Sequence, residues 1–300
     1  MRAAPRAAAR PKSDTVRRVQ FAPCVSVSIF LTLVCVLASQ PARAAQSELT
    51  PLQQEIKTLS ARLSSIDVEE RREAVVRLGA LGRPEGSRAA AAALGDTAAI
   101  VRATAAHAVL SLPSGAATTL ILPLLHDRDE FVRREAAYAL GLTRSPAGVS
   151  ALAAAVETDK QPSVRGAAAV ALGQVGDASA VPVLAGALAR RLQASGFFNR
   201  VRRRKVEEDE FVRRAAAVSL GQIGSRDGVP VLVETLSNAR TPDDVRREAA
   251  RALGLIGDTA AVPALRSVLT QRDPYLSRIA FEALRKLDPS TATRPAGGGL

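Results

Sequence analysis

The sequence predicts an all-α protein, an α-solenoid (superhelix) of stacked antiparallel helix pairs. Two observations lead to this fold class. The stretch DEFVRREAAYALG at 129–141 recurs 80 residues later as DEFVRRAAAVSLG at 209–221, with most positions identical. Apolar residues make up 47% of the chain but aromatic residues only 3%, so Ala, Val and Leu must build the core. Self-similarity at a fixed period indicates a repeat architecture, and small apolar residues suit closely packed helices.

An arginine that usually follows an apolar residue marks each repeat. These key arginines recur about every 32 residues, except for one step of 48 residues. They are Arg71, Arg102, Arg133, Arg165, Arg213 and Arg246, and Ser277 takes their place in the last unit. We therefore expect about six full repeats of ~32 residues plus a half-repeat at each end.

Each unit reads as helix, tight turn, helix. Between Val132 and Leu140 the apolar residues fall on one helical face. In most units one glycine follows eight residues after the key arginine, and a second glycine follows three residues later, where it suits the left-handed position that ends a helix. Asp177 and Asp258 can then cap the next helix. Pro182, Pro230 and Pro263 stand near the first turn of that second helix, where a missing N–H costs nothing.

Two units depart from this pattern, and an acid recurs in several. The second unit has Leu110 and Pro113, and the third has Arg144, at glycine positions, so their turns should differ locally. An acid often lies six residues before the key arginine, as Asp96 does before Arg102. We expect these acids to form a polar ladder along the inter-repeat turns; the alternative is solvated surface charge worth under about 1 kcal/mol per pair.

Residues 1–44 have the layout of a secretory signal peptide. A basic segment precedes the apolar run 24–38, and Ala42-Arg43-Ala44 offers a cleavage site. The alternative is an uncleaved N-terminal membrane anchor. We expect an exported protein, periplasmic or secreted, or else anchored and facing the periplasm. Both cysteines, Cys24 and Cys35, would leave with the leader, which excludes disulfides and thiolate metal ligands from the mature chain.

The basic character of the chain is local. Its net charge is +12, but without residues 1–44 the charge is +6. Residues 190–205 hold seven basic residues and no acid, and without them the remainder is −1. A near-neutral solenoid argues against a nucleic-acid partner.

The 48-residue step contains an insertion at about 192–208. Candidate partner-binding residues in it are Phe197, Phe198, Arg200, Arg202, Arg203, Arg204 and Lys205. Three interpretations stay open: a solvated loop, a docking element with two aromatic anchors and arginines that select an acidic partner, or a contact with an anionic membrane surface.

No catalytic constellation is evident. His107 lies within a predicted helix among alanines, where packing explains it better than metal binding, and His126 lies at a helix end. Phosphate loops, zinc motifs and nucleophile elbows are absent from the sequence. We expect neither cofactor nor metal.

Units such as EFVRREAAYALG followed by VPVLxxxL resemble HEAT repeats, particularly the bacterial phycobilisome-lyase-like (PBS lyase HEAT-like) type. The resemblance covers about 50–288 and implies a solenoid domain at 45–288, followed by a tail at 289–300 that we expect to be disordered.

The resemblance raises enzymatic alternatives. Deoxyhypusine hydroxylase is a HEAT-like enzyme that binds iron through His-Glu pairs, but the matching positions here read Arg72-Glu73, Arg134-Glu135 and Arg247-Glu248. Because a guanidinium has no free lone pair, it cannot ligate iron. A bilin lyase-like activity is the second alternative, disfavoured by the leader and the scarcity of Cys and His. HEAT-like DNA glycosylases need a cationic concave face, which the near-neutral solenoid lacks.

The sequence thus favours a non-enzymatic protein–protein interaction scaffold of the bacterial cell envelope. It would use the basic and aromatic insertion and a concave solenoid face, which we expect the second helix of each unit to line.

Overall fold

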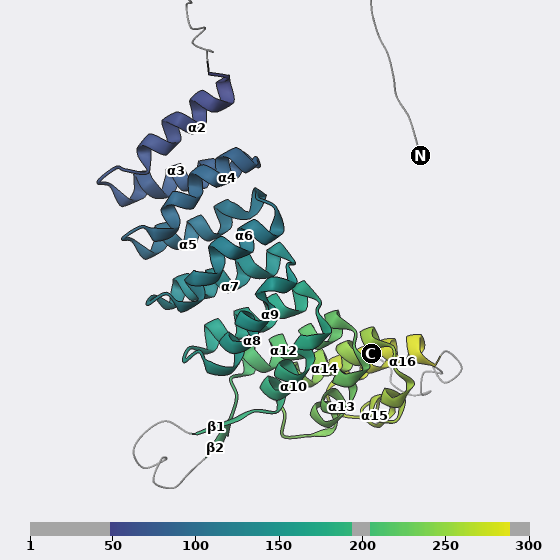
Figure 1. Ribbon diagram of the computed structural model, residues 1–300. Coiled ribbons are helices and arrows are strands. Elements are labelled where there is room, and N and C mark those ends of the chain that lie inside the picture. Colours follow the sequence, from purple (N-terminus) through teal and green to yellow (C-terminus); the bar gives the residue numbers. More distant parts are fainter. Residues whose placement is uncertain (1–48, 194–204, 289–300) are drawn as a thin grey trace, which may run out of the picture. The chain divides into compact units, whose positions relative to one another are not determined.

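The computed structural model describes residues 49–193 and 205–288. Fourteen α-helices lie within these residues, all in the unit Thr50–Leu300 (Figure 1). They are α2 (Pro51–Arg62), α3 (Val68–Ala80), α4 (Pro84–Ala90), α5 (Ala99–Ala108), α6 (Ser114–Ile121), α7 (Glu130–Thr143), α8 (Val149–Thr158), α9 (Pro162–Val175), α10 (Val181–Ala189), α12 (Glu210–Ile223), α13 (Val229–Ser237), α14 (Asp243–Ile256), α15 (Val262–Ser267) and α16 (Pro274–Leu287). The predicted α-solenoid is confirmed, because these helices stack in pairs along the chain.

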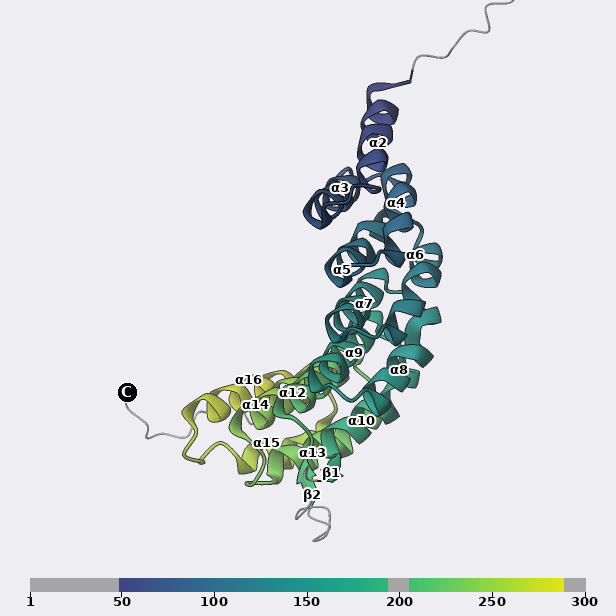
Figure 2. The same cartoon turned by 90° about the vertical axis from the view of Figure 1, so that its left-hand side faces the viewer.

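The helices form two layers (Figure 2). The layer of key-arginine helices comprises α3, α5, α7, α9, α12, α14 and α16, and the layer of outer helices comprises α2, α4, α6, α8, α10, α13 and α15. Of the outer helices, a key-arginine helix packs mainly on the one that precedes it in sequence, as α9 does on α8 and α14 on α13. The six predicted units and two terminal helices account for the same fourteen helices. In the structure these helices pack as seven pairs, each formed by an outer helix and the key-arginine helix that follows it.

The key-arginine helices line the concave side of the stack (Figure 2). Each packs closely on its neighbours in the same layer, while neighbouring outer helices pack on one another far less. A layer in close contact must lie at the inner radius of a curved stack. The prediction that the second helices line the concave face is therefore wrong.

A seam of small residues allows this close packing. A Cβ added to Gly79 in α3 would lie 2.9 Å from the Ala108 Cα in α5, and one on Gly221 in α12 would lie 2.8 Å from the Ala252 Cα in α14. Where a unit has the first glycine, that glycine therefore allows the next key-arginine helix to approach closely. The second unit has Leu110 there, and its α-helix ends at Ala108 and continues as a 3-10 segment, Val109–Ser111.

The second glycine has the predicted left-handed conformation. Gly82, Gly176, Gly224 and Gly257 all have positive φ. In the third unit Arg144 ends α7 in the same region, with φ 51° and ψ 27°. L-residues with a side chain adopt this conformation at a cost.

Short 3-10 segments complete the turns: Ala91–Gly95, Val109–Ser111, Leu122–His126, Pro146–Gly148, Ala178–Ala180, Arg226–Gly228 and Thr259–Ala261. The predicted caps are present in these turns. Asp177 accepts a hydrogen bond from the Ser179 N–H, and Asp258 accepts one from the Ala260 N–H.

Two short strands interrupt the helices between α10 and α12. Strand β1 (Arg191–Gln193) pairs with β2 (Lys205–Glu207) in antiparallel register, with Leu192 opposite Val206. The insertion therefore leaves the stack as a strand pair, which sequence patterning did not predict. None of the helices in the described ranges is long and apolar enough to span a bilayer.

Candidate functional site

A ladder of buried arginines joins successive repeats on the side of the inter-repeat turns. Arg102 in α5 donates from Nε and Nη2 to both carboxylate oxygens of Asp127, at 2.7 and 2.8 Å. Its Nη1 donates to the backbone carbonyls of Asp96 and Thr97. The Arg102 guanidinium thus binds backbone carbonyls of its own repeat and a carboxylate of the next repeat. The planar guanidinium of arginine suits such bidentate bonding to a carboxylate.

We call each key arginine, together with the groups of the next repeat that it binds, a step of the ladder. In the first four steps the arginine binds a carboxylate. Arg71 pairs with Asp96, and Arg133 pairs with Asp159, both at 2.7 Å from Nε. The aspartate six residues before a key arginine therefore has two partners. Its carboxylate accepts hydrogen bonds from the key arginine of the previous repeat, and its backbone carbonyl accepts one from the key arginine of its own repeat. Each of these aspartates also accepts a backbone N–H two residues later, as Asp96 does from Ala98.

The fourth step uses a residue supplied by the insertion. Glu208, directly after β2, is fully buried and accepts hydrogen bonds from Arg165 at 2.5 and 3.1 Å and from Arg190 at 3.3 Å. Sequence analysis assigned no role to Glu208, which lies five residues before Arg213. Its position, one residue off the register of the ladder acids, is the reason that patterning missed it.

Hydrogen bonds to arginine set the pKa values of the ladder aspartates. Arg71 holds the pKa of Asp96 below its ordinary value, and Arg102 does the same for Asp127. For Asp159, burial raises the pKa, but hydrogen bonds from Arg133 and from the backbone of Gln161 outweigh it, so the net shift is downward. These carboxylates are therefore charged in the folded protein near neutral pH.

The last two steps lack this carboxylate. Arg240 stands where the ladder acid of the sixth key-arginine helix would be, and Gln271 stands there in the last. Arg213 donates instead to the Leu188 carbonyl, to Glu207 and, at 3.5 Å, to the Thr241 hydroxyl. Arg246 donates to the Leu236 carbonyl and to Gln271.

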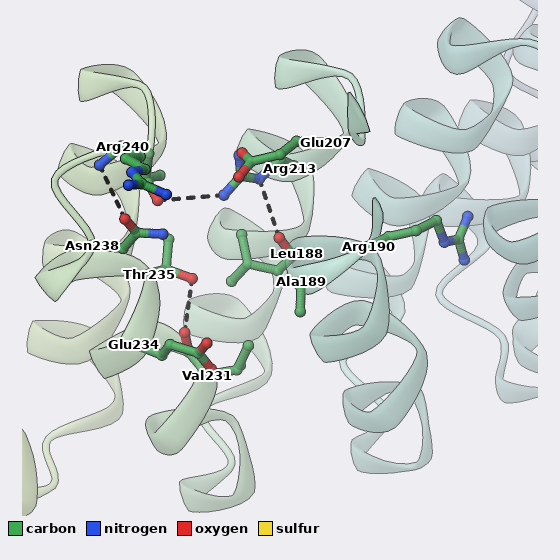
Figure 3. A pocket seen from close by; sticks show the side chains of 11 residues that line it. Leu188, Ala189, Arg190, Glu207, Arg213, Val231, Glu234, Thr235, Asn238 and Arg240 are labelled. Atoms are coloured by element: carbon green, nitrogen blue, oxygen red, sulfur yellow. Dashed lines mark hydrogen bonds and ion pairs between the residues drawn. The ribbon is translucent and has the colours of Figure 1, made fainter. Parts of the chain in front are cut away.

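A cavity of about 330 Å³ opens at the fifth step, where Arg240 replaces the ladder aspartate. Its walls come from the end of α10, β2, the start of α12, and α13 with the loop that follows (Figure 3). The lining residues are Leu188, Ala189, Arg190, Glu207, Arg213, Val231, Glu234, Thr235, Asn238, Arg240 and Thr241. A second, more open hollow lies at the next step, around Arg246, Gln271 and Tyr275.

Comparison with protein families decides what these repeats are. A family model described as HEAT repeats matches residues 118–194 and 236–295, and a model described as PBS lyase HEAT-like repeat matches 212–238. The chain is a HEAT-repeat protein. None of the curated proteins compared with it matches.

This HEAT-repeat protein is similar to several solved structures. YibA from Escherichia coli is 21% identical with a TM-score of 0.55, and the match covers 79% of this chain and 82% of that one. The complex of CpcE and CpcF of phycocyanin lyase from Nostoc sp. PCC7120 is 24% identical (TM-score 0.45, 83% of this chain and 92% of that one). Human deoxyhypusine hydroxylase in complex with glycerol is 20% identical (TM-score 0.38, 79% and 96%). At 21% identity the likeness to YibA shows the fold alone.

The predicted partner-binding residues of the insertion are not brought together by the described part of the HEAT-repeat chain. Lys205 lies in β2. The other six, Phe197, Phe198, Arg200, Arg202, Arg203 and Arg204, lie outside the described residues. The six key arginines, by contrast, all lie in the ladder.

The concave layer carries one polar cluster that the sequence did not reveal. His107 in α5 lies 3.1 Å from Glu135 in α7, and Arg134 also pairs with Glu135. Arg134 further stacks over the Phe131 ring at 5.0 Å. Among the described residues no group of three or more His, Cys, Asp or Glu side chains is arranged to hold a metal ion.

Proposed function

We propose that this HEAT-repeat chain is a non-enzymatic scaffold that binds another protein on its concave layer. One observation carries the proposal. Of the ten large hydrophobic side chains exposed in the described residues, seven lie on key-arginine helices and one, Leu120, lies on an outer helix. The seven are Val68, Val76, Ile100, Leu142, Phe211, Leu255 and Tyr275.

Such a distribution separates a docking face from an ordinary surface. Single exposed apolar residues are normal on any protein, but their concentration on one layer marks an interaction surface. Arginines are interleaved with them, and Arg247 stacks over the Tyr275 ring at 5.3 Å. Aromatic residues and arginines are enriched in the cores of protein interfaces.

We further propose that the scaffold works in the bacterial cell envelope, as an exported or anchored protein. The basic segment, the apolar run and Ala42-Arg43-Ala44 within residues 1–44 support export. The insertion would add a second contact, to the partner or to an anionic membrane surface.

Capture from an envelope extract tests the concave layer. Leu142 and Leu255 are both 55% exposed, so changing both to Asp should leave helicity and melting unchanged while capture falls at least tenfold. Leu120→Asp, on an outer helix and 37% exposed, is the matched control and should retain capture. Equal capture by both variants would contradict the concave face as the binding surface.

The insertion needs its own variant, because Glu207 and Glu208 at its base hold arginines of the stack. Replacing 194–204 by Asn-Gly joins Gln193 to Lys205 as a two-residue hairpin and keeps both acids. Melting should stay unchanged and capture should weaken. Purified chain that carries iron or a bilin absorbance band would instead favour an enzyme or a lyase accessory.

A further inference from the structure

Comparison with the first four steps shows that the fifth step of the ladder lacks a carboxylate from the next repeat. Asp96, Asp127 and Asp159 each close a step, and Glu208 closes the fourth. At the fifth step the equivalent residue is Arg240, so an acid is replaced by a residue of opposite charge. The HEAT-repeat stack continues through this step with the usual packing of α12 on α14.

Arg213 does not use its Nε and Nη2 atoms to bind a carboxylate, as the arginines of the first four steps do. In the closed steps Nε and Nη2 share one carboxylate, whereas Arg213 Nε donates to the Leu188 carbonyl and Nη2 reaches only Thr241, at 3.5 Å. That distance is at the weak limit of a hydrogen bond. Nη1 is the nitrogen that meets Glu207.

Arg240 is the unbalanced charge of this cavity. No acid in the described residues forms an ion pair with its guanidinium; its backbone N–H donates to Asn238. In Figure 3 the Arg240 guanidinium lies on the side of the cavity that faces Arg213. Arg190, the third arginine of the lining, points away and is held by Glu208 and the Val156 carbonyl.

We propose that this cavity binds a carboxylate side chain from an acidic segment of a partner protein. The carboxylate would lie between Arg240 and the Nη2 of Arg213, where the ladder elsewhere holds its own aspartate, and the Thr241 hydroxyl would donate to it. The cavity volume of about 330 Å³ falls at the lower end of ligand sites, which suits one or two side chains of an extended segment. The inference rests on the proposed protein-binding function, since the partner supplies the acid.

Glu234 on α13 sets the selectivity of the site. It lines the same cavity and is exposed, with no ion pair among the described residues. A run of consecutive acids would be repelled by it, so the site favours acids that alternate with neutral residues. Glu234→Gln should then tighten binding about fivefold, as expected for removal of one partly screened repulsion of about 1 kcal/mol.

A capped peptide tests the site without the partner. The full chain is titrated with Ac-Gly-Asp-Leu-Asp-Gly-amide, and the side-chain Nε–H signals of Arg213 and Arg240 are followed by NMR. Both signals should shift and saturate, with Ac-Gly-Asn-Leu-Asn-Gly-amide producing at least tenfold weaker binding. Arg240→Asp should abolish binding and raise the melting temperature, because the chain then closes its own fifth step. Arg278→Ala, which removes an exposed arginine of α16, should leave binding unchanged.

Three results would overturn the proposal: equal binding of the Asn peptide, undiminished binding to the Arg240→Asp variant, or shifts confined to arginines outside the cavity. Stronger binding of an uncapped peptide through its terminal carboxylate would overturn the assignment to an acidic side chain. Failure of this test leaves the concave-layer capture experiment intact, so the two proposals fail separately.

Discussion

The two halves of the ladder differ in how they join repeats. In the first four steps a buried arginine meets a carboxylate, whereas Arg213 and Arg246 donate to carbonyl and neutral oxygens or, in the case of Arg213, to Glu207 beside its own helix. The helices stack in the same way in both halves. The comparison teaches that the apolar seam and the small residues build the HEAT-repeat solenoid, and that the carboxylates add ion pairs between successive repeats.

The largest expected effect comes from opening a closed step. Asp127→Ala leaves Arg102, which is 7% exposed, as a buried charge without its carboxylate and should cost about 3–5 kcal/mol. Gln271→Ala removes the equivalent neutral acceptor of Arg246 and should cost only about 1 kcal/mol. Urea unfolding of the two variants measures both losses. Similar losses would contradict the distinction between the two halves.

A fall in pH should destabilise the first half of the solenoid before the second half. The pKa values of Asp96, Asp127 and Asp159 are lowered by folding, so their stabilisation is fully present above the unfolded pKa of about 3.9 and is lost as the pH falls through the folded values. Hydrogen exchange between pH 5 and pH 2.5 should show protection lost first in α3, α5 and α7. Protection lost first in α12 and α14 would contradict this order.

A smaller effect is expected at the seam. Gly221→Ala places a Cβ 2.8 Å from the Ala252 backbone and should cost about 1–2 kcal/mol, because two helices must move apart. Gly186→Ala in α10 meets no atom within 4 Å and should instead stabilise by about 0.5–1 kcal/mol through helix propensity. Thermal melting of both variants checks the opposite signs.

The smallest effect concerns a single turn. Arg144→Gly relieves the left-handed backbone at the end of α7 and should stabilise by about 1 kcal/mol. The reverse change in the neighbouring unit, Gly176→Ala, should cost a similar amount. Identical melting temperatures for both variants and the parent would show that these turns relax without strain.

Much of the fold could be predicted because it is local and repeated. The left-handed glycines, the Asp177 and Asp258 caps and the number of helices follow from spacing alone. The role of the first glycine could not be predicted, because it depends on the approach of a helix about 30 residues away.

The candidate site was harder to predict for the same reason. The pattern placed Asp96 with Arg102, but the hydrogen bonds of its carboxylate go to Arg71, 25 residues earlier. Periodicity reports position within a unit and not which neighbouring unit a side chain reaches. Arg240 was visible as a break in the acid register, yet only the cavity beside it gives that break a meaning.

The glycine–alanine seam also has a mechanical consequence. Backbones in direct contact at the inner radius cannot be compressed, while the loosely packed outer helices can separate or close. Bending of the solenoid must therefore pivot on Gly79, Gly141, Gly173, Gly221 and Gly254. A cargo that is longer or shorter than the resting curve would be accommodated by many small rotations shared among the repeats, so the molecule should behave as a spring of nearly constant inner length.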